Sequence, residues 1–323
     1  MYHEQKSGVN HRYLYQKLLH LATFLPEQFI FNKQLLICPF YHGISNESLP
    51  YISPIYPLIN TKTFEKELEQ FLKKFEPISL DELLDSNSIF TRNKKPKLLL
   101  SFDDGLSSCY DYIAPLLLQK GIPAIFFINS AFADNQDLMF RYKAAILCSK
   151  MGSKKALEIS YANRNLLDEW ALELEIDFKQ LAISQKPYMN GEQILDLSAK
   201  GFEIGAHSDS HPLFCEIDES QQWMEIERSV NFVKNLTQKP CRTFAFPFHD
   251  QGVGIGLMEK AVDELGLSYF FGSSAFMKEP YPRLLQRFPM ENQPVSGMTL
   301  IKRNLWSSKI KSLLGMNLIK REK

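Results

Sequence analysis

The sequence has 323 residues, of which 45% are hydrophobic and 23% are charged. This composition is typical of a globular protein, and the length suits one large α/β barrel or two smaller domains. Lysine plus arginine and aspartate plus glutamate each number 37, so no charge excess indicates a nucleic-acid partner. The five cysteines form no CxxC pair and are odd in number, which argues against a disulfide framework.

The N-terminal residues predict neither a secretory signal nor a membrane span. Residues 13–40 are rich in apolar side chains, but ionisable side chains interrupt the segment throughout. It therefore cannot cross a bilayer. The chain opens without a basic segment or a small-residue cleavage site. We therefore expect a cytoplasmic protein with a helical extension over residues 1–30. An amphipathic helix at 13–25 that packs on the domain is preferred to one lying on a membrane surface.

Short apolar runs alternate with helical periodicity along the chain, which predicts βα units around a mostly parallel sheet. Strands are predicted at 35–41, 97–102, 124–128, 202–206, 243–248 and 267–271. Helices are predicted at 64–75, 110–119, 190–200, 219–236 and 257–265. Between the first of these helices and the second strand, Ser79 and Glu82 form a capping box for a further short helix.

Residues 134–186 depart from this alternation because they are charged and rich in helical patterns. We predict an insertion over one face of the sheet that helps to shape a substrate cleft. Within it, Arg141 and Lys143 predict a solvated helix face in preference to a site for an anionic lipid phosphate or sugar. The tail, residues 301–323, carries seven Lys or Arg and one Glu with apolar residues interleaved, which leaves peripheral membrane contact open.

A first group of reactive side chains follows the predicted strand at 97–102. The sequence Ser-Phe-Asp-Asp-Gly at 101–105 places two adjacent carboxylates on a loop after a strand, where barrel enzymes carry their reactive groups. One carboxylate can bind a metal while its neighbour faces the substrate as a base. Taken alone, however, Asp-Asp-Gly is explained better by ordinary turn chemistry.

A second group follows the predicted strand at 202–206. His207 and His211 lie four residues apart and can converge on one ion if the loop turns helically. By themselves they are equally consistent with two solvated histidines. With one carboxylate they make three protein ligands and leave the fourth position open to water, which is the arrangement of a catalytic metal site.

In this order, the two motifs resemble those of the polysaccharide deacetylase family, also called the NodB-homology family or carbohydrate esterase family four. The resemblance extends from about residue 35 to residue 289. It implies Asp103 as the catalytic base and Asp104, His207 and His211 as ligands of one divalent metal ion. Zinc is expected, with cobalt, nickel, manganese and iron as alternatives.

A third motif, Phe-Ala-Phe-Pro-Phe at 244–248, is similar to the one found in the Ala-Tyr-Pro branch of the family. There the backbone N–H after the proline contributes to the oxyanion site, so Phe248, preceded by Pro247, is expected to take this role. Tyr-His-Gly at 41–43 likewise resembles the Tyr-His pair found early in that branch.

The sequence departs from the family pattern at the base and at the acid. The arginine that orients the base in some members is Ala245 here, and Arg287, in a segment that resembles the branch's late Leu-Pro-Arg-Ile, is expected to replace it. The late Leu-x-His motif that supplies the general acid is absent. His42 and His249 are the candidates for the acid, and His42 is preferred because it follows the first predicted strand.

The resemblance implies an α/β fold, an irregular (β/α)7-like barrel with a helical insertion. The catalytic domain would cover residues 31–300, between the extension at 1–30 and the basic tail. The implied reaction is metal-dependent hydrolysis of an N-acetyl group from an amino sugar in a glycan, glycolipid or lipid-linked precursor. Alternatives are deformylation of an amino sugar, a catalytically inactive carbohydrate-binding barrel, and a structural protein with unconnected Asp and His residues.

Overall fold

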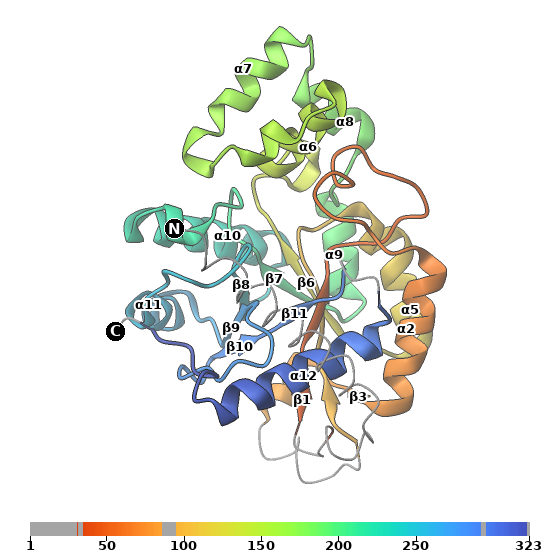
Figure 1. Ribbon diagram of the computed structural model, residues 1–323, viewed down its shortest axis with the longest axis vertical. Helices are drawn as coiled ribbons and strands as arrows, with labels where there is room; N and C mark the ends of the chain where they lie inside the picture. Colours follow the sequence, from red (N-terminus) through yellow and green to blue (C-terminus); the bar gives the residue numbers. More distant parts are fainter. Residues whose placement is uncertain (1–30, 32–34, 86–94, 292–294, 322–323) are drawn as a thin grey trace, which may run out of the picture.

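A parallel eight-stranded sheet forms the centre of the molecule in the computed structural model, which describes residues 31, 35–85, 95–291 and 295–321 (Figure 1). Its order is β10-β9-β8-β7-β6-β5-β2-β11, and every neighbouring pair is parallel. The strands are β2 (Pro39–Tyr41), β5 (Leu100–Phe102), β6 (Ala124–Ile128), β7 (Glu203–Ala206), β8 (Thr243–Ala245), β9 (Tyr269–Gly272), β10 (Leu284–Gln286) and β11 (Phe288–Pro289).

The barrel closes at Arg287. Strands β10 and β11 are the two ends of the sheet, yet Arg287 alone separates them in the chain. The segment pairs with β9 through β10 and with β2 through β11, so it bridges the two ends. Counted as one bent strand, it leaves seven strand positions around a nearly closed barrel. The predicted irregular barrel is therefore confirmed.

Helices surround the barrel and connect its strands (Figure 1). They are α2 (Thr61–Lys74), α3 (Leu80–Leu84), the π-helical η2 (Cys109–Ile113) that leads into α5 (Ala114–Lys120), α9 (Gly191–Ala199), α10 (Glu219–Thr237), α11 (Ile255–Leu265) and α12 (Gly297–Leu313). Short 3-10 helices are η3 (Ala133–Asn135), η4 (Lys154–Glu158), η5 (Tyr161–Asn163) and η6 (Phe214–Glu216). The capping box of Ser79 with Glu82 at α3 is confirmed, as is the Asn190 cap of α9.

The predicted helical insertion consists mainly of α6 (Phe140–Met151), α7 (Asn165–Glu173) and α8 (Phe178–Gln185). It begins after the carboxyl end of β6 and ends before α9. In Figure 1 its green helices cover the end of the barrel opposite a small parallel sheet, which consists of β1 (Leu36–Ile37), β4 (Lys97–Leu98) and β3 (Glu76–Pro77). The insertion therefore covers one end of the barrel, and not one face of an open sheet.

Alternating strand residues divide the core into two layers. In β6, Phe126 and Ile128 belong to the larger hydrophobic cluster, which also contains buried side chains from the surrounding helices. Ile125 and Phe127 belong to a smaller cluster, together with Cys38, Leu99, Ala245 and Phe271. The smaller cluster fills the inside of the barrel, since the Arg287 guanidinium lies 5.1 Å from the Phe127 ring centre at the closing segment.

Several predicted boundaries differ from the structure. Two predicted strands are each split in two, at Cys38 and at Leu99. The strand predicted at 243–248 ends at Ala245, because Pro247 cannot donate a ladder hydrogen bond and Phe248 has a left-handed backbone (φ 57°). The helix predicted at 13–25 lies outside the described residues.

Helix α12 begins before the predicted tail at residue 301 and packs against α2, with Ile301 and Leu305 buried. Beyond them, Leu313 and Leu314 are exposed. None of the helices in the described ranges combines the length and hydropathy that crossing a membrane requires.

Candidate active site

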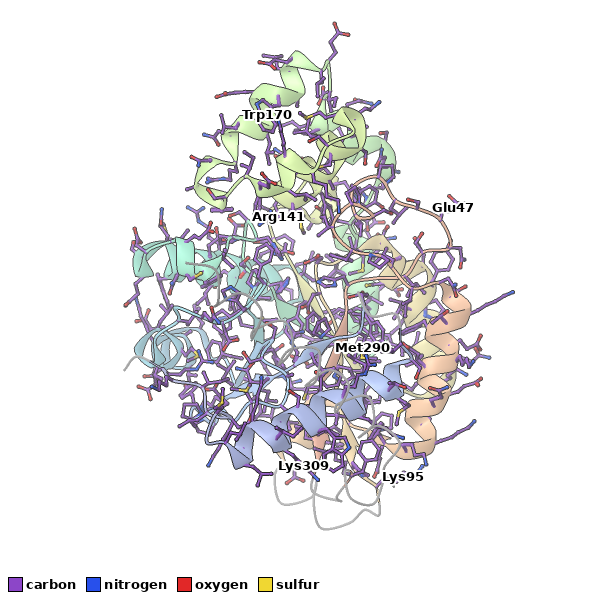
Figure 2. The ribbon with its side chains drawn as sticks, viewed as in Figure 1. Glu47, Lys95, Arg141, Trp170, Met290 and Lys309 are labelled. Atoms are coloured by element: carbon purple, nitrogen blue, oxygen red, sulfur yellow. The ribbon has the colours of Figure 1, made fainter. Side chains whose placement is uncertain are left out.

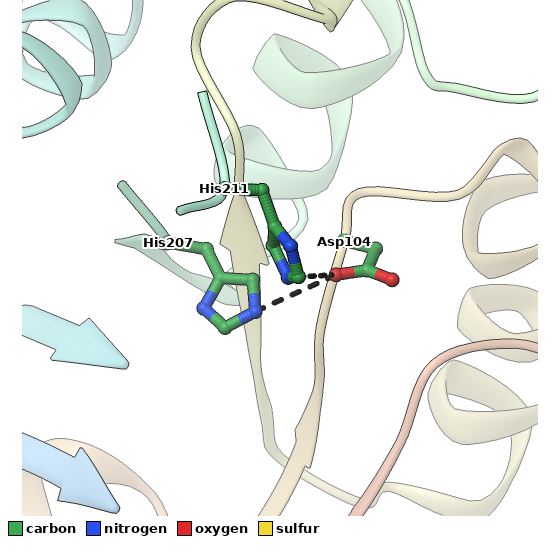
Figure 3. A group of neighbouring side chains, drawn as sticks. All are labelled: Asp104, His207 and His211. Carbon is green, nitrogen blue, oxygen red and sulfur yellow. Dashed lines mark ion pairs between the residues drawn. The ribbon is translucent and has the colours of Figure 1, made fainter. Parts of the chain in front are cut away.

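Three side chains from two loops meet at the carboxyl end of the barrel. Asp104 follows β5, and His207 and His211 follow β7. Their potential ligand atoms all lie within 4.8 Å of one another, and all three residues are buried. Figure 3 shows both imidazole rings facing Asp104: the Nε2 atoms of His207 and His211 lie 3.5 and 3.3 Å from the same oxygen, Oδ1. The structure thus brings the three predicted ligands together.

The two loops that carry these side chains contain residues with left-handed backbone angles. Asp104, Ser208 and His211 have positive φ angles of 68°, 67° and 58°. Such angles cost free energy for residues other than glycine, and they concentrate at functional sites. The loop after β7 is held by buried hydrogen bonds: the Asn129 side chain donates to the His207 carbonyl, and the Ser208 hydroxyl accepts from the His211 N–H at 3.1 Å.

The ligand set fits a divalent transition metal. His207 Nδ1–H donates to the Ala245 carbonyl at 2.8 Å, so its Nε2 lone pair is directed toward Asp104. Burial lowers the pKa of His211, which keeps that imidazole neutral as a ligand must be. Asp104 Oδ1 is buried without a hydrogen-bond donor, whereas Oδ2 accepts from the Tyr142 hydroxyl at 3.2 Å. One carboxylate and two neutral imidazoles are the donors that zinc and its neighbours prefer.

Asp103 is held by Arg287, as the sequence predicted. The guanidinium donates to both carboxylate oxygens, at 2.7 and 2.8 Å, and also to the Ser101 hydroxyl at 3.0 Å. Both side chains are almost fully buried, so Arg287 is not a surface residue. Burial favours the protonated acid, but the adjacent Arg287 charge outweighs it and lowers the pKa of Asp103. Asp103 is therefore ionised and fixed in orientation, 3.8 Å from His207 Nε2.

His42 forms a second acid–base pair, with Glu291. Its Nδ1 lies 2.7 Å from Glu291 Oε2, and Glu291 Oε1 accepts from the His42 backbone N–H at 2.6 Å. Burial lowers the pKa of His42, but the charge and hydrogen bond of Glu291 raise it to about 9 overall. The ring also stacks on Tyr56, with centroids 4.6 Å apart. At neutral pH, His42 is therefore a protonated imidazolium.

Sequence reasoning missed Glu291. A carboxylate two residues after a strand, at the carboxyl end of the barrel, is a usable signal, but β11 has only two residues and was not predicted. Tyr56 and Tyr142 were also missed, since aromatic residues in such segments are usually core residues.

The third motif places Phe248 at the edge of the site. Its ring lies 4.8 Å from that of His211, and its carbonyl accepts from the Ser273 hydroxyl at 2.6 Å. No described residue accepts a hydrogen bond from the Phe248 N–H, so this donor is available to a ligand. Pro247 is buried, and its carbonyl accepts from the His249 N–H. Neither Pro247 nor His249 lines the pocket described next.

A pocket of about 240 Å³ joins these groups. Asp103, Asp104, His42 and Arg287 line it, together with both histidine ligands, Phe248 and apolar or aromatic side chains from β2 and its following loop. Of the two candidates for the general acid, the structure thus places His42 in the pocket and His249 outside it. A candidate metal site, an oriented carboxylate and an imidazolium in one barrel pocket define a hydrolase-like centre.

Comparison with known protein families and solved structures agrees with a hydrolase. The family model described as polysaccharide deacetylase matches residues 91–269, more than half of the chain. The chain therefore belongs to the polysaccharide deacetylase family, and the prediction of this family is confirmed. No curated protein sequence matches the chain.

Solved structures of low sequence identity share the fold. IcaB from Ammonifex degensii is 16% identical, with a TM-score of 0.55 over 84% of this chain and 97% of its own. The Streptococcus pyogenes deacetylase PplD, solved with acetate, is 14% identical, with a TM-score of 0.57 over 83% and 97%. A de-N-acetylase from Aggregatibacter actinomycetemcomitans is 16% identical, with a TM-score of 0.55 over 82% and 99%. At these identities the similarity concerns the fold alone.

Proposed function

We propose that this chain is a metal-dependent de-N-acetylase that hydrolyses the acetamido group of an amino sugar. The observation that carries the proposal is one pocket in which Asp104, His207 and His211 converge beside the Asp103–Arg287 pair and His42. Family membership and the names of the structural relatives, a de-N-acetylase among them, support the same chemistry.

Asp104, His207 and His211 would hold the divalent cation. When bound there, the cation supplies Lewis acidity, which polarises a carbonyl group and makes water easier to deprotonate. The ionised Asp103 would take a proton from the attacking water, as a general base held in orientation by Arg287. The Phe248 N–H would donate to the carbonyl oxygen as negative charge develops on it.

His42 would act as the general acid. The departing amine needs a proton, and a pKa of about 9 keeps His42 protonated at neutral pH. Glu291 supports this role by holding Nδ1, which leaves Nε2 as the proton donor. His42 would therefore replace the late histidine that the chain lacks.

The pH dependence of Glu291→Gln tests this assignment. If protonated His42 is required, wild-type kcat/KM stays high below its pKa and falls as pH rises through about 9. Removing the Glu291 charge removes the main influence that raises this pKa, so the alkaline decline should begin at lower pH in Glu291→Gln. Rate profiles from pH 6 to pH 10 measure the shift. An alkaline decline at the same pH in both proteins would exclude His42 as the acid.

Product analysis tests the function itself. Metal-loaded protein should release acetate and free amine from N-acetylated oligosaccharides or lipid-linked N-acetyl sugars, and prior removal of metal with a chelator should abolish the release. N-formyl substrates in the same assay separate deacetylation from deformylation. If no substrate loses an acyl group although glycan still binds, the chain is the inactive carbohydrate-binding barrel.

The cellular location stays a prediction. We propose a cytoplasmic protein that acts in building a surface glycan and that contacts membranes peripherally through its tail. The exposure of Leu313 and Leu314 beside Lys309 and Lys311 supports that contact, since apolar and basic side chains together favour anionic membrane surfaces.

A further inference from the structure

One cation in the active-site pocket has no anionic partner. The Arg287 charge is matched by Asp103, and the His42 charge by Glu291. Arg141, from the start of α6 in the insertion, lines the same pocket. Across the described ranges, no carboxylate oxygen lies within 4.0 Å of its guanidinium. Figure 2 places Arg141 where the helices of the insertion meet the barrel.

The contacts of Arg141 leave most of its hydrogen-bonding capacity unused. One terminal nitrogen donates to the Leu157 carbonyl at 2.6 Å, whereas a guanidinium has five N–H donors. Its central carbon lies 4.8 Å from the Phe140 ring centre and 5.7 Å from that of Phe248. Burial lowers the pKa of Arg141 overall, although the charge of Glu216 raises it. The Glu216 carboxylate makes no ion pair with Arg141 and accepts a hydrogen bond from the Tyr161 N–H.

The neighbouring Lys143 provides a contrast on the same helix. Its ammonium group lies 3.1 Å from Asp137 and 3.0 Å from Asp168, so its charge is neutralised within the insertion. The predicted solvated helix face is therefore wrong for both residues: Lys143 is paired, and Arg141 faces the pocket. The two aromatic rings and one carbonyl stabilise the half-buried Arg141 cation only in part, so its remaining N–H donors can bind an anionic ligand.

We propose that Arg141 binds an anionic group on the substrate, a phosphate ester or a carboxylate, at the mouth of the active-site pocket. The inference rests on the proposed function and specifies its substrate as an acidic N-acetyl sugar. Both groups match the planar guanidinium, which can donate two parallel hydrogen bonds to either.

The geometry places this anion near the reacting group. The Phe248 ring lies close to both Arg141 and His211: its centre is 5.7 Å from the Arg141 guanidinium carbon and 4.8 Å from the His211 ring centre. The pocket, at about 240 Å³, lies below the roughly 300–1,000 Å³ usual for ligand sites, so it suits one sugar ring. The anionic group therefore belongs to the sugar that carries the acetamide, or to its immediate neighbour.

Matched substrates test the proposal. The methyl glycoside of N-acetylglucosamine is neutral, N-acetylglucosamine 1-phosphate carries a phosphate, and N-acetylglucosaminuronic acid carries a carboxylate. Wild-type protein should process at least one acidic sugar with a kcat/KM about 10- to 100-fold above that of the neutral one, as expected for a charge-assisted hydrogen bond. Arg141→Met should lower the kcat/KM for the preferred acidic sugar about 10- to 100-fold more than that for the neutral one, so that the preference is lost, and Arg141→Lys should retain part of it. Arg228→Met, at a largely exposed arginine paired with Asp209, is the matched control.

The outcomes separate the alternatives. A preference for the phosphate or for the uronate identifies the source of the anion. Equal losses on neutral and acidic sugars in Arg141→Met would mean that Arg141 only supports Phe248 and η4, and would overturn the proposal, as would a wild-type preference for the neutral sugar. If no sugar is deacetylated, the proposed function fails, and calorimetry decides the binding claim: weaker binding of N-acetylglucosamine 1-phosphate to Arg141→Met supports it, and equal binding refutes it.

Discussion

Replacing His207 by alanine should remove both the metal and the activity. His207 is one of three buried candidate ligands, and the Ala245 carbonyl orients its imidazole, so its removal would leave only two. We expect purified wild-type protein to hold roughly one divalent ion per chain and His207→Ala to hold almost none. The kcat/KM should fall about 1,000-fold or more, because Lewis-acid assistance supplies several kcal/mol.

Elemental analysis after dialysis, with acetate release on the same samples, measures both effects. His249→Ala is the matched control, since this histidine lies outside the pocket and should change neither quantity. Retention of a full equivalent of metal by His207→Ala would show that the ion binds elsewhere. A wild-type chain that takes up no divalent metal at all would refute the metal-dependent reaction.

Asp103→Asn should slow turnover strongly and leave metal binding intact. The amide has nearly the shape of the carboxylate but cannot accept a proton from water, so kcat should fall about 100- to 10,000-fold. KM should change little, because Asp103 assists the chemical step and does not anchor the sugar. The variant also leaves Arg287 buried without its anion, so we expect it to be less stable by about 3 kcal/mol.

Urea unfolding, metal content and kcat are the measurements, and the assay temperature must lie below the melting temperature of the variant. Asp209→Asn is the control: this carboxylate follows β7, pairs with Arg228 and does not line the pocket. An unchanged kcat in Asp103→Asn would assign the base to another group. Loss of metal in this variant would instead make Asp103 a ligand.

The reactive loops were predictable from the sequence because each follows a recognisable apolar strand. Asp104 comes two residues after β5, and His207 comes directly after β7. Parallel strands of a barrel present their carboxyl ends on one side, so the loops after them had to meet there. The short strands β10 and β11 carry too few residues for an apolar pattern, and the sequence did not reveal how the barrel closes.

The sequence by itself determined the family, the barrel and the residues that meet at the candidate metal site, since these depend on motifs of a few adjacent residues. The sequence resemblance also suggested Arg287 as the partner of Asp103, but only the tertiary structure showed this contact and revealed Glu291 as the partner of His42. Arg287 and Asp103 are 184 residues apart, and Glu291 and His42 are 249 apart, yet barrel closure brings each pair into hydrogen-bonding contact. The tertiary structure also shows that Arg141, from the insertion, lines the pocket. The charge state of a buried group depends on which distant side chain lies beside it, and folding alone brings such side chains together.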